Sequence, residues 1–235
     1  MNNSMKFDLS LIFNKDALTA LGEAYGWTIF ITASALIIGI LLGTMLAVCK
    51  VIPKTNAVAK VLDKIASTYV AIFRGTPLTV QLFIFSYIIF TGVILFNRRV
   101  TPYMIAAIGF GLNSAAYVSE IFRAGILSVD KGQMEAGRAL GLSYGKTMKS
   151  IILPQAAKNI IPPLGNEAIT LVKDTSVAYI IGVTEFFTAI KSIASSTYNV
   201  VTPYIFSAAV YFVTVLIMTI CLSKLEKRLR RSDVR

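Results

Sequence analysis

The chain has 235 residues, of which 55% are hydrophobic and only 15% are charged. This composition lies outside the range of soluble globular proteins and predicts an integral membrane protein of the all-α class. The formal net charge of +11 does not indicate nucleic-acid binding, because the basic residues stand in short clusters at the ends of apolar runs and not on one polar face.

The first half of the chain is expected to hold three membrane spans. The polar start of the chain lacks the basic start and apolar core of a cleavable signal peptide. Three apolar runs follow that are long enough to cross roughly 30 Å of hydrocarbon as helices. They cover residues 25–49, 66–95 and 102–127, and a basic connector at 50–64 joins the first two. The second is interrupted where Thr76 precedes Pro77, a pair typical of the N-cap and first turn of a new helix, so we expect Thr76 to cap a helix there and this span to be bent or broken.

A polar segment at 131–163 separates these spans from the rest, and we expect it to form two short helices. The helix formers from Gln133 to Leu140 are followed by Gly141, which fits the left-handed residue that ends a helix. Ser143 can cap a second helix, which we expect to bend at Pro154 because proline removes a backbone donor. The segment should therefore be a compact knob between membrane spans.

Two further spans are predicted at 165–190 and 203–222, with a loop at 192–202 between them. The chain is then a single transmembrane domain over residues 1–235, with five spans and its termini on opposite sides. An N-terminus outside and a C-terminus in the cytosol leave most of the 23 basic residues in the cytosol, as the positive-inside rule requires. The polar segment 131–163 is cytosolic in this topology.

The same segment holds a string that resembles a nucleotide-binding P-loop without matching it. The P-loop needs four residues between its two glycines, whereas Gly141 and Gly145 are separated by three. No strand pattern precedes the string. We therefore predict that this chain binds no ATP and that any ATP that drives it is bound by another chain.

Polar residues inside the spans are functional candidates, because a charge in the membrane is costly unless it faces protein or water. Asn113, Tyr117 and Glu120, with Ser114 beside them, lie on one face of the third span. Asp174 ends a similar stripe in the fourth span that begins with Glu167, and depth favours Asp174 as the functional carboxylate. Helix packing is the alternative for the neutral groups, and a structural ion pair, such as Glu120 with Arg123, is the alternative for the charged ones.

The break in the second span is a candidate site for an anionic group such as a carboxylate. A half-helix that begins near Pro77 would point unpaired amides and a positive dipole end into the membrane, beside Thr76, and Arg74 would add a full charge. A simple proline kink, with Arg74 extending to the cytosolic face, is the alternative.

The knob has two uses on pattern alone: docking a soluble partner, or lying on lipid headgroups as an ordinary pair of interfacial helices. Its residues resemble the EAA loop of the membrane subunits of bacterial ABC importers. The resemblance departs from the motif at Gly137, where many members have a second alanine. It implies that the knob couples the chain to an ATPase. The residues that carry it are Glu135, Ala136, Gly137, Gly141, Leu153 and Pro154.

Three further stretches resemble permeases for polar amino acids of the histidine, glutamine, glutamate and arginine group. They lie at 73–78, 114–126 and 172–176. The resemblance implies a type I ABC importer permease in a bacterial cytoplasmic membrane, working with a second permease copy or paralogue, an ABC ATPase dimer and an extracytoplasmic amino-acid-binding protein. ATP and Mg would be bound by the ATPase, so this chain is expected to have no cofactor of its own and to be a transport subunit, not an enzyme.

Two other classes of function remain open on the sequence. A self-contained secondary transporter or channel would usually show an internal repeat, and none is visible between the halves of the chain. A membrane enzyme would need a catalytic constellation, and the chain has no histidine and no nucleophile motif. Copurification of an ATPase separates the ABC permease from both alternatives. The sequence does not identify which amino acid is carried, or whether the permeases pair as homodimers or heterodimers.

Overall fold

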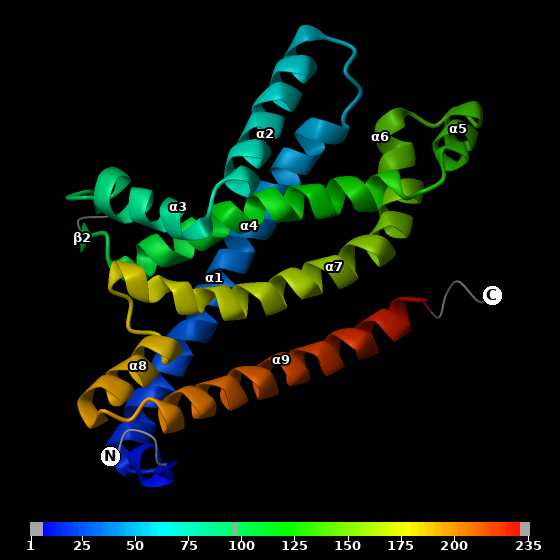
Figure 1. Cartoon of the computed structure of the whole chain (residues 1–235). Helices are drawn as coiled ribbons and strands as arrows, with labels where there is room; N and C mark the ends of the chain where they lie inside the picture. The colour runs from blue at the N-terminus through cyan, green and yellow to red at the C-terminus, as the bar shows by residue number, and fades with distance from the viewer. Residues whose placement is uncertain (1–6, 96–97, 231–235) are drawn as a thin grey trace. The chain divides into compact units, whose positions relative to one another are not determined.

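The computed structural model describes residues 7–95 and 98–230, in which the secondary structure consists of helices and one short pair of strands, joined by turns and loops (Figure 1). The strands β1 (Ile94–Leu95) and β2 (Arg98–Arg99) pair antiparallel, with Ile94 opposite Arg99. The helices are η2 (Leu9–Leu11), α1 (Lys15–Val51), α2 (Ala57–Gly75), α3 (Leu78–Ile84), η3 (Phe85–Ile89), α4 (Pro102–Leu127), α5 (Lys131–Ala139), α6 (Tyr144–Thr147), η4 (Met148–Ile152), α7 (Leu153–Asp174), η5 (Thr175–Ile181), α8 (Phe186–Thr197) and α9 (Val201–Arg230). Of the short elements, η2 and η5 are 3-10 helices, whereas η3 and η4 are π-helical.

The third predicted span coincides with α4, and the predicted break in the second span is confirmed. Helices α2 and α3 meet at a bend of 107°. The prediction that Thr76 caps the new helix is wrong, because Pro77 occupies the cap position and makes no side-chain cap hydrogen bond. Instead, Gln81 donates from Nε2 to the Thr76 hydroxyl at 2.8 Å and to the Thr76 carbonyl at 3.0 Å.

The helix is not interrupted at Pro154, because one continuous helical stretch runs through α6, η4 and α7, but its course turns between α6 and α7, in line with the predicted bend (Figure 1). The π-helical turn of η4 ends immediately before Leu153 and Pro154, and the Leu153 amide donates to the carbonyl of Met148, five residues back. A π turn displaces the carbonyl that a proline ring would otherwise meet. Pro154 is therefore accommodated at the second position of α7.

The chain after α7 also differs from the prediction. The fourth span was expected to end at residue 190 and to be followed by a loop, but the break falls earlier, at residues 182–185, and α8 continues to Thr197. Gly182 takes a left-handed conformation with φ of 82°, which ends η5. The Glu185 side chain then caps α8 by accepting from the amides of Phe187 and Thr188. Gly182, which ends one helix, and Glu185, which caps the next, therefore break the helix although the sequence stays apolar through residue 190.

Within residues 7–95 and 98–230, three helices have the length and apolar composition needed to cross a membrane, and the number rises to five if each of two bent pairs counts as one span. The three are α1, α4 and Val201–Leu229 of α9, whose mean hydropathies are 2.4, 1.3 and 2.4. The bent pairs join Ala57–Gly75 to Leu78–Ile89 and Tyr144–Ile181 to Phe186–Thr197. Both α1 and α9 extend beyond the predicted spans, which started at 25 and 203.

The helices contribute to two compact units. The first comprises the described part of Met1–Ile37 with Thr76–Gly111 and Ile169–Met218. Its core brings α1 and α8 together, as Leu21 and Ala24 join Phe186 and Ile190. The ring of Tyr25 meets that of Phe186 edge-on, with centroids 5.7 Å apart, and the Tyr25 and Thr214 hydroxyls lie 2.9 Å apart.

The second unit comprises Ile38–Gly75, Leu112–Ala168 and the described part of Thr219–Arg235. Small residues let its helices approach closely. A Cβ on Gly39 would lie 2.7 Å from the Ser114 hydroxyl, and a Cβ on Gly43 would lie 2.7 Å from the Val118 Cβ. Close approach at glycine is a common means of packing membrane helices. It holds α1 against the part of α4 that carries the predicted polar residues.

Candidate functional site: a helical knob and a polar pocket

The predicted knob is present and consists of α5, α6 and η4, at the end of α4 (Figure 1). Asp130 caps α5 by accepting from the Gly132 amide at 2.7 Å. At the other end, the Leu142 amide donates to the Gly137 carbonyl at 3.1 Å and the Gly141 amide donates to the Arg138 carbonyl at 3.0 Å. Gly141 has φ of 79°. These bonds and this conformation form a Schellman motif, which confirms the predicted helix end.

The two short helices pack through Gly137, which is buried. A Cβ at this position would lie 2.5 Å from Cγ2 of Thr147, a residue with no exposed surface, and 3.3 Å from Cδ1 of Ile151. The predicted cap is also observed, because the Lys146 amide donates to the Ser143 hydroxyl at 3.4 Å. Glycine at 137 thus allows an approach of α5 to α6 and η4 that alanine would not.

The remaining predicted knob residues are available at the surface. Glu135, Ala136, Gly141 and Pro154 are exposed, and Leu153 is 39% exposed. Sequence reasoning treated Leu140 only as the end of a helix, yet its side chain is 81% exposed. Its position directly before the helix-ending Gly141 was the sequence feature that could have indicated this exposure. The knob therefore presents a leucine, a carboxylate and small residues to solvent.

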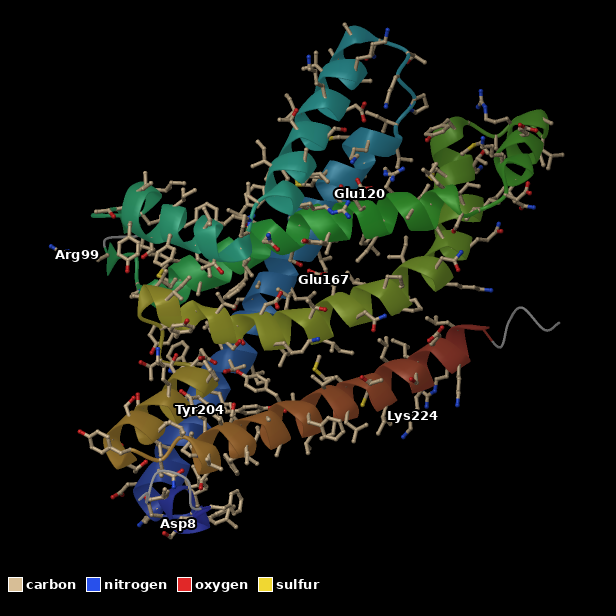
Figure 2. All side chains as sticks on the ribbon, viewed as in Figure 1. Asp8, Arg99, Glu120, Glu167, Tyr204 and Lys224 are labelled. Carbon is tan, nitrogen blue, oxygen red and sulfur yellow. The ribbon has the colours of Figure 1, made fainter. Side chains whose placement is uncertain are left out.

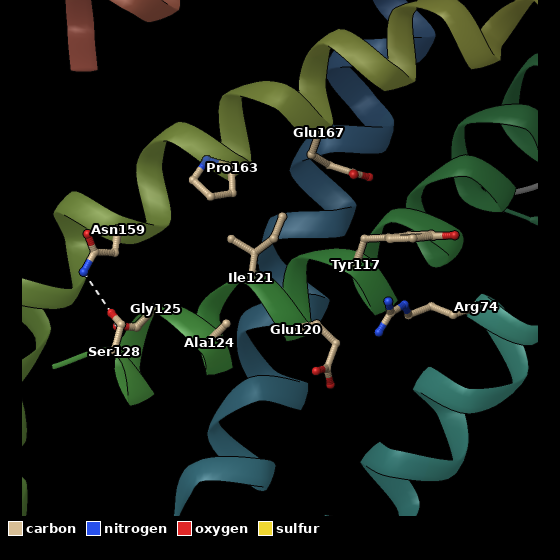
Figure 3. Close-up of a pocket in the computed structure, with 10 residues that line it drawn as sticks. All are labelled: Arg74, Tyr117, Glu120, Ile121, Ala124, Gly125, Ser128, Asn159, Pro163 and Glu167. Carbon is tan, nitrogen blue, oxygen red and sulfur yellow. Dashed lines mark hydrogen bonds between the residues drawn. The ribbon is translucent and has the colours of Figure 1, made fainter. Parts of the chain in front are cut away.

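The second unit also holds an open pocket of about 480 Å³ among α2, α4 and α7 (Figure 3). Figure 2 shows Glu120 on α4 and Glu167 on α7, the two carboxylates of its wall. The lining residues are Arg74, Tyr117, Glu120, Ile121, Ala124, Gly125, Ser128, Asn159, Pro163 and Glu167. Three of them, Arg74, Tyr117 and Glu120, were predicted from the sequence.

Aromatic and amide contacts join α2 to α4 beside this pocket. Arg74 points toward Tyr117 in Figure 3, and its guanidinium carbon lies 5.4 Å from the centroid of the tyrosine ring, within range of a cation–π interaction. Asn113 donates from Nδ2 to the Phe73 carbonyl at 3.3 Å, and the Tyr69 hydroxyl donates to the Leu112 carbonyl at 2.8 Å. Asn113 therefore adjoins the pocket and helps to position α2.

Glu120 is the centre of an ion-pair cluster. Its Oε2 accepts from Nε and Nη2 of Arg123 at 3.0 and 2.8 Å, which is the ion pair that the sequence offered as an alternative role. Its Oε1 accepts from Nζ of Lys50, in the last turn of α1. The Lys50 and Glu120 side chains are only 12% and 20% exposed. Sequence reasoning placed Lys50 in a cytosolic connector, and no residue near it in the sequence indicates that it pairs with Glu120.

A second carboxylate, Glu167, joins α7 to α4. The fully buried Ser114 hydroxyl donates to Glu167 Oε1 at 2.7 Å. Sequence reasoning ranked Asp174 above Glu167 by depth, and the structure places Glu167 in the pocket wall. Thr76 and Asp174 belong to the other unit, where Asp174 is the last residue of α7. The predicted residues Arg74, Asn113, Ser114, Tyr117 and Glu120 all belong to the unit that contains the pocket.

Glu185, in the first unit, is a buried charged residue that sequence reasoning missed. It has no exposed surface and accepts from the amides of Phe187 and Thr188 at 2.9 and 2.8 Å. The hydroxyls of Thr188, Thr28 and Tyr211 also donate to it, at 3.0, 3.3 and 3.3 Å. Its position after Gly182 and before an apolar pair was the available signal of a helix cap. Glu185 stabilises the start of α8.

Comparisons with known proteins agree with the helical membrane architecture. A family model described as "Binding-protein-dependent transport system inner membrane component" matches residues 39–231. The arginine transport system permease protein ArtQ of Bacillus subtilis is 40% identical over 211 residues, which cover 90% of this chain and 93% of ArtQ. A putative glutamine transport system permease protein GlnP of Rickettsia bellii is 43% identical over 83% of this chain and 86% of its own length.

Solved structures show the same relationship. The crystal structure of an amino acid ABC transporter with histidines contains a chain with a TM-score of 0.83 and 36% identity, and the match covers 95% of this chain and all of that one. The methionine ABC transporter MetNI, at 17% identity and a TM-score of 0.78 over 93% of this chain, shares the fold. The chain therefore belongs to the family of inner membrane components of binding-protein-dependent transport systems, and is a permease subunit.

Proposed function

We propose that this chain is the membrane-spanning permease subunit of a bacterial ABC importer for polar amino acids. The observation that carries the proposal is the pairing of an intact, exposed knob with family membership over most of the chain. The relatives named for arginine and glutamine transport support the substrate class. The complete importer would add a second permease copy or paralogue, an ATPase dimer and an extracytoplasmic binding protein.

The proposed topology has five spans, an external N-terminus and a cytosolic C-terminus in the bacterial cytoplasmic membrane. Three long apolar helices and two bent pairs supply five candidate spans. The positive-inside rule then supports a cytosolic position for the knob and for the basic tail that begins at Lys224. In this topology residues 1–235 form a single permease domain.

The knob is proposed to dock the ATPase. The exposed Leu140, at the C-terminal end of α5, supplies an apolar anchor, and the exposed Glu135 within α5 supplies a charge. An apolar residue surrounded by polar ones is a common pattern at protein interfaces. ATP and Mg would be held by the partner, because the P-loop-like string at 141–147 is divided here between a Schellman turn and the start of α6.

The polar pocket is proposed to belong to the substrate pathway. A zwitterion that leaves water needs donors for its carboxylate and acceptors for its ammonium group. Arg74 and Tyr117 offer donors in the pocket wall, and the carboxylates of Glu120 and Glu167 offer acceptors. Asn113, which donates to the Phe73 carbonyl, and Ser114, which donates to Glu167, lie next to the pocket wall. Thr76 and Asp174 remain proposed contributors from the first unit.

The test is reconstitution of the chain with its ATPase and binding protein in proteoliposomes. Polar amino acids are added one at a time, and ATP hydrolysis and uptake are measured. We expect one or more of arginine, histidine, glutamine and glutamate to stimulate both. Stimulation by none of these, with the complex intact, would contradict the substrate class. Arginine and glutamine uptake by Glu120→Gln and Asp174→Asn then tests the acceptors: loss for both substrates indicates contact with the ammonium group, and selective loss for arginine indicates contact with a side chain.

A further inference from the structure

The first unit contains a separate pocket of about 330 Å³, which none of the features above uses. It lies among the N-terminal part of α1, the start of α4 and α8, and its volume is at the lower end of the range for small-molecule sites, about 300–1,000 Å³. The lining residues are Ala17, Ala20, Glu23, Ala24, Trp27, Tyr103, Thr184, Ala189, Ser192 and Ile193.

Two aromatic rings form part of the wall. The ring centroids of Trp27 and Tyr103 are 4.4 Å apart and their planes are tilted by 40°. Phe30, one turn further along α1, meets Trp27 edge-on at 5.6 Å and holds the indole in place. Trp27 is nevertheless 41% exposed. A large aromatic surface therefore stays open to a ligand.

The pocket also carries a negative charge without a counterion. Glu23 is exposed, and among the described residues its carboxylate has no hydrogen-bond or ion-pair partner. The basic residue nearest along α8 is Lys191, next to the lining residue Ser192, but its ammonium group lies over the Tyr179 ring at 4.3 Å from the centroid. The described part of the chain therefore supplies no ion-pair partner for this carboxylate.

We propose that this pocket binds an organic ammonium group, with Glu23 facing the charge and the Trp27 and Tyr103 rings packing against its methylene or methyl groups. The negative face of an aromatic ring attracts an alkylated cation, and tryptophan does so most strongly. A bare metal ion fits poorly, because no group of three metal-ligating side chains occurs among the described residues. The ammonium group can come from a soluble amine or from an amine-bearing lipid headgroup.

The proposed site shares no lining residue with the polar pocket and includes none of the residues proposed for the substrate pathway. Trp27 is the only tryptophan in the chain, so its fluorescence reports on this pocket alone. The full-length chain in detergent can therefore be titrated directly, without an ATPase or a transport assay.

The probe is tetramethylammonium chloride, titrated against sodium chloride at equal ionic strength. We expect a saturable change in Trp27 emission that sodium does not produce. Glu23→Gln should raise the half-saturation concentration by about threefold or more, because it removes the only charge in the lining. Asp16→Asn is the matched control, since Asp16 is an exposed carboxylate on the same helix that does not line the pocket. Its titration should match that of the parent protein.

Tyr103→Leu should weaken the response, whereas Tyr103→Phe should preserve it, because the ring and not the hydroxyl supplies the wall. The source of the ammonium group is decided in mixed micelles. Phosphatidylethanolamine should compete with the probe if the site takes a headgroup, whereas phosphatidylglycerol, which lacks the amine, should not. If neither lipid competes with the probe, the ammonium group that the site binds comes from a soluble amine. A non-saturable response, or an equal one in Glu23→Gln with unchanged circular dichroism, would overturn the proposal.

Discussion

The knob and the polar pocket belong to the same unit but are held in different ways. The knob depends on contacts between near neighbours in sequence, such as the Leu142 amide with the Gly137 carbonyl and Gly137 with Thr147. The pocket depends on partners that are distant in sequence: Lys50 and Glu120 are 70 residues apart, and Ser114 and Glu167 are 53 residues apart. The knob is a local structure, whereas the pocket exists only when α2, α4 and α7 meet.

This difference predicts how each region responds to substitution. In the knob, a single glycine has no alternative residue with the same backbone freedom or the same small volume, so one change should be enough to disrupt it. In the pocket, charged residues are linked in pairs, and the effect of one change depends on its partner. The experiments below test that contrast.

The largest expected effect is that of Gly137→Leu. The added Cβ would lie 2.5 Å from Thr147 Cγ2, and the rest of the side chain would force α5 away from α6 and η4. Overpacking of this kind typically costs about 1–3 kcal/mol, and here it would displace the helix that carries the proposed docking residue Glu135. We expect ATPase association, measured by copurification, to fall by about tenfold or more.

Gly145→Ala is the matched control for that variant, since a Cβ at Gly145 meets no atom within 4 Å. It should bind the ATPase like the parent protein. An equal loss of ATPase association in both variants would mean that the knob tolerates no substitution at either glycine. Undiminished association in Gly137→Leu would show that close packing at Gly137 is not needed for docking.

Gly141→Val should have the next largest effect, for a purely conformational reason. A Cβ at Gly141 meets no neighbouring atom, but the backbone has φ of 79°, where a β-branched residue is strained by about 1–3 kcal/mol. Coupled ATP hydrolysis in proteoliposomes should fall while membrane insertion persists. Gly141→Asn, which tolerates the left-handed region, should retain most of the activity; identical behaviour of the two variants would exclude strain as the cause.

Glu120→Gln should have an intermediate effect that depends on Lys50. Removing the carboxylate leaves the mostly buried Lys50 without its partner, and we expect a loss of about 1–3 kcal/mol in the free energy of unfolding. Lys50→Met combined with Glu120→Gln should cost less than the sum of the single changes. Thermal unfolding of the four proteins in detergent gives the coupling energy, and simple additivity would show that the ion pair contributes nothing.

The smallest expected effect is that of Lys146→Ala on nucleotide binding. The purified chain should bind no ATP, so the substitution should change nothing in an equilibrium binding measurement with labelled ATP. Binding by the parent protein that Lys146→Ala abolishes would restore the P-loop interpretation of residues 141–147.

Local sequence determined those features that one backbone segment can establish alone. The α4 helix has the predicted bounds because an apolar run starts at Pro102, a favoured first residue, and continues for the length of a span. The break before α3 and the helix end at Gly141 follow from the conformational limits of proline and the freedom of glycine, both of which act within a few residues.

Tertiary structure decided the features that depend on a partner far along the chain. The sequence pattern assigned Lys50 to a connector and ranked Asp174 above Glu167, because spacing shows which residues share a helix face but not which face of another helix they meet. Pro154 continues a helix because the π turn of η4 makes room for its ring, and α8 begins where the buried Glu185 finds Thr28 and Tyr211 on two other helices. Burial removes the competition of water for such polar groups, so their hydrogen bonds form only once the helices have packed.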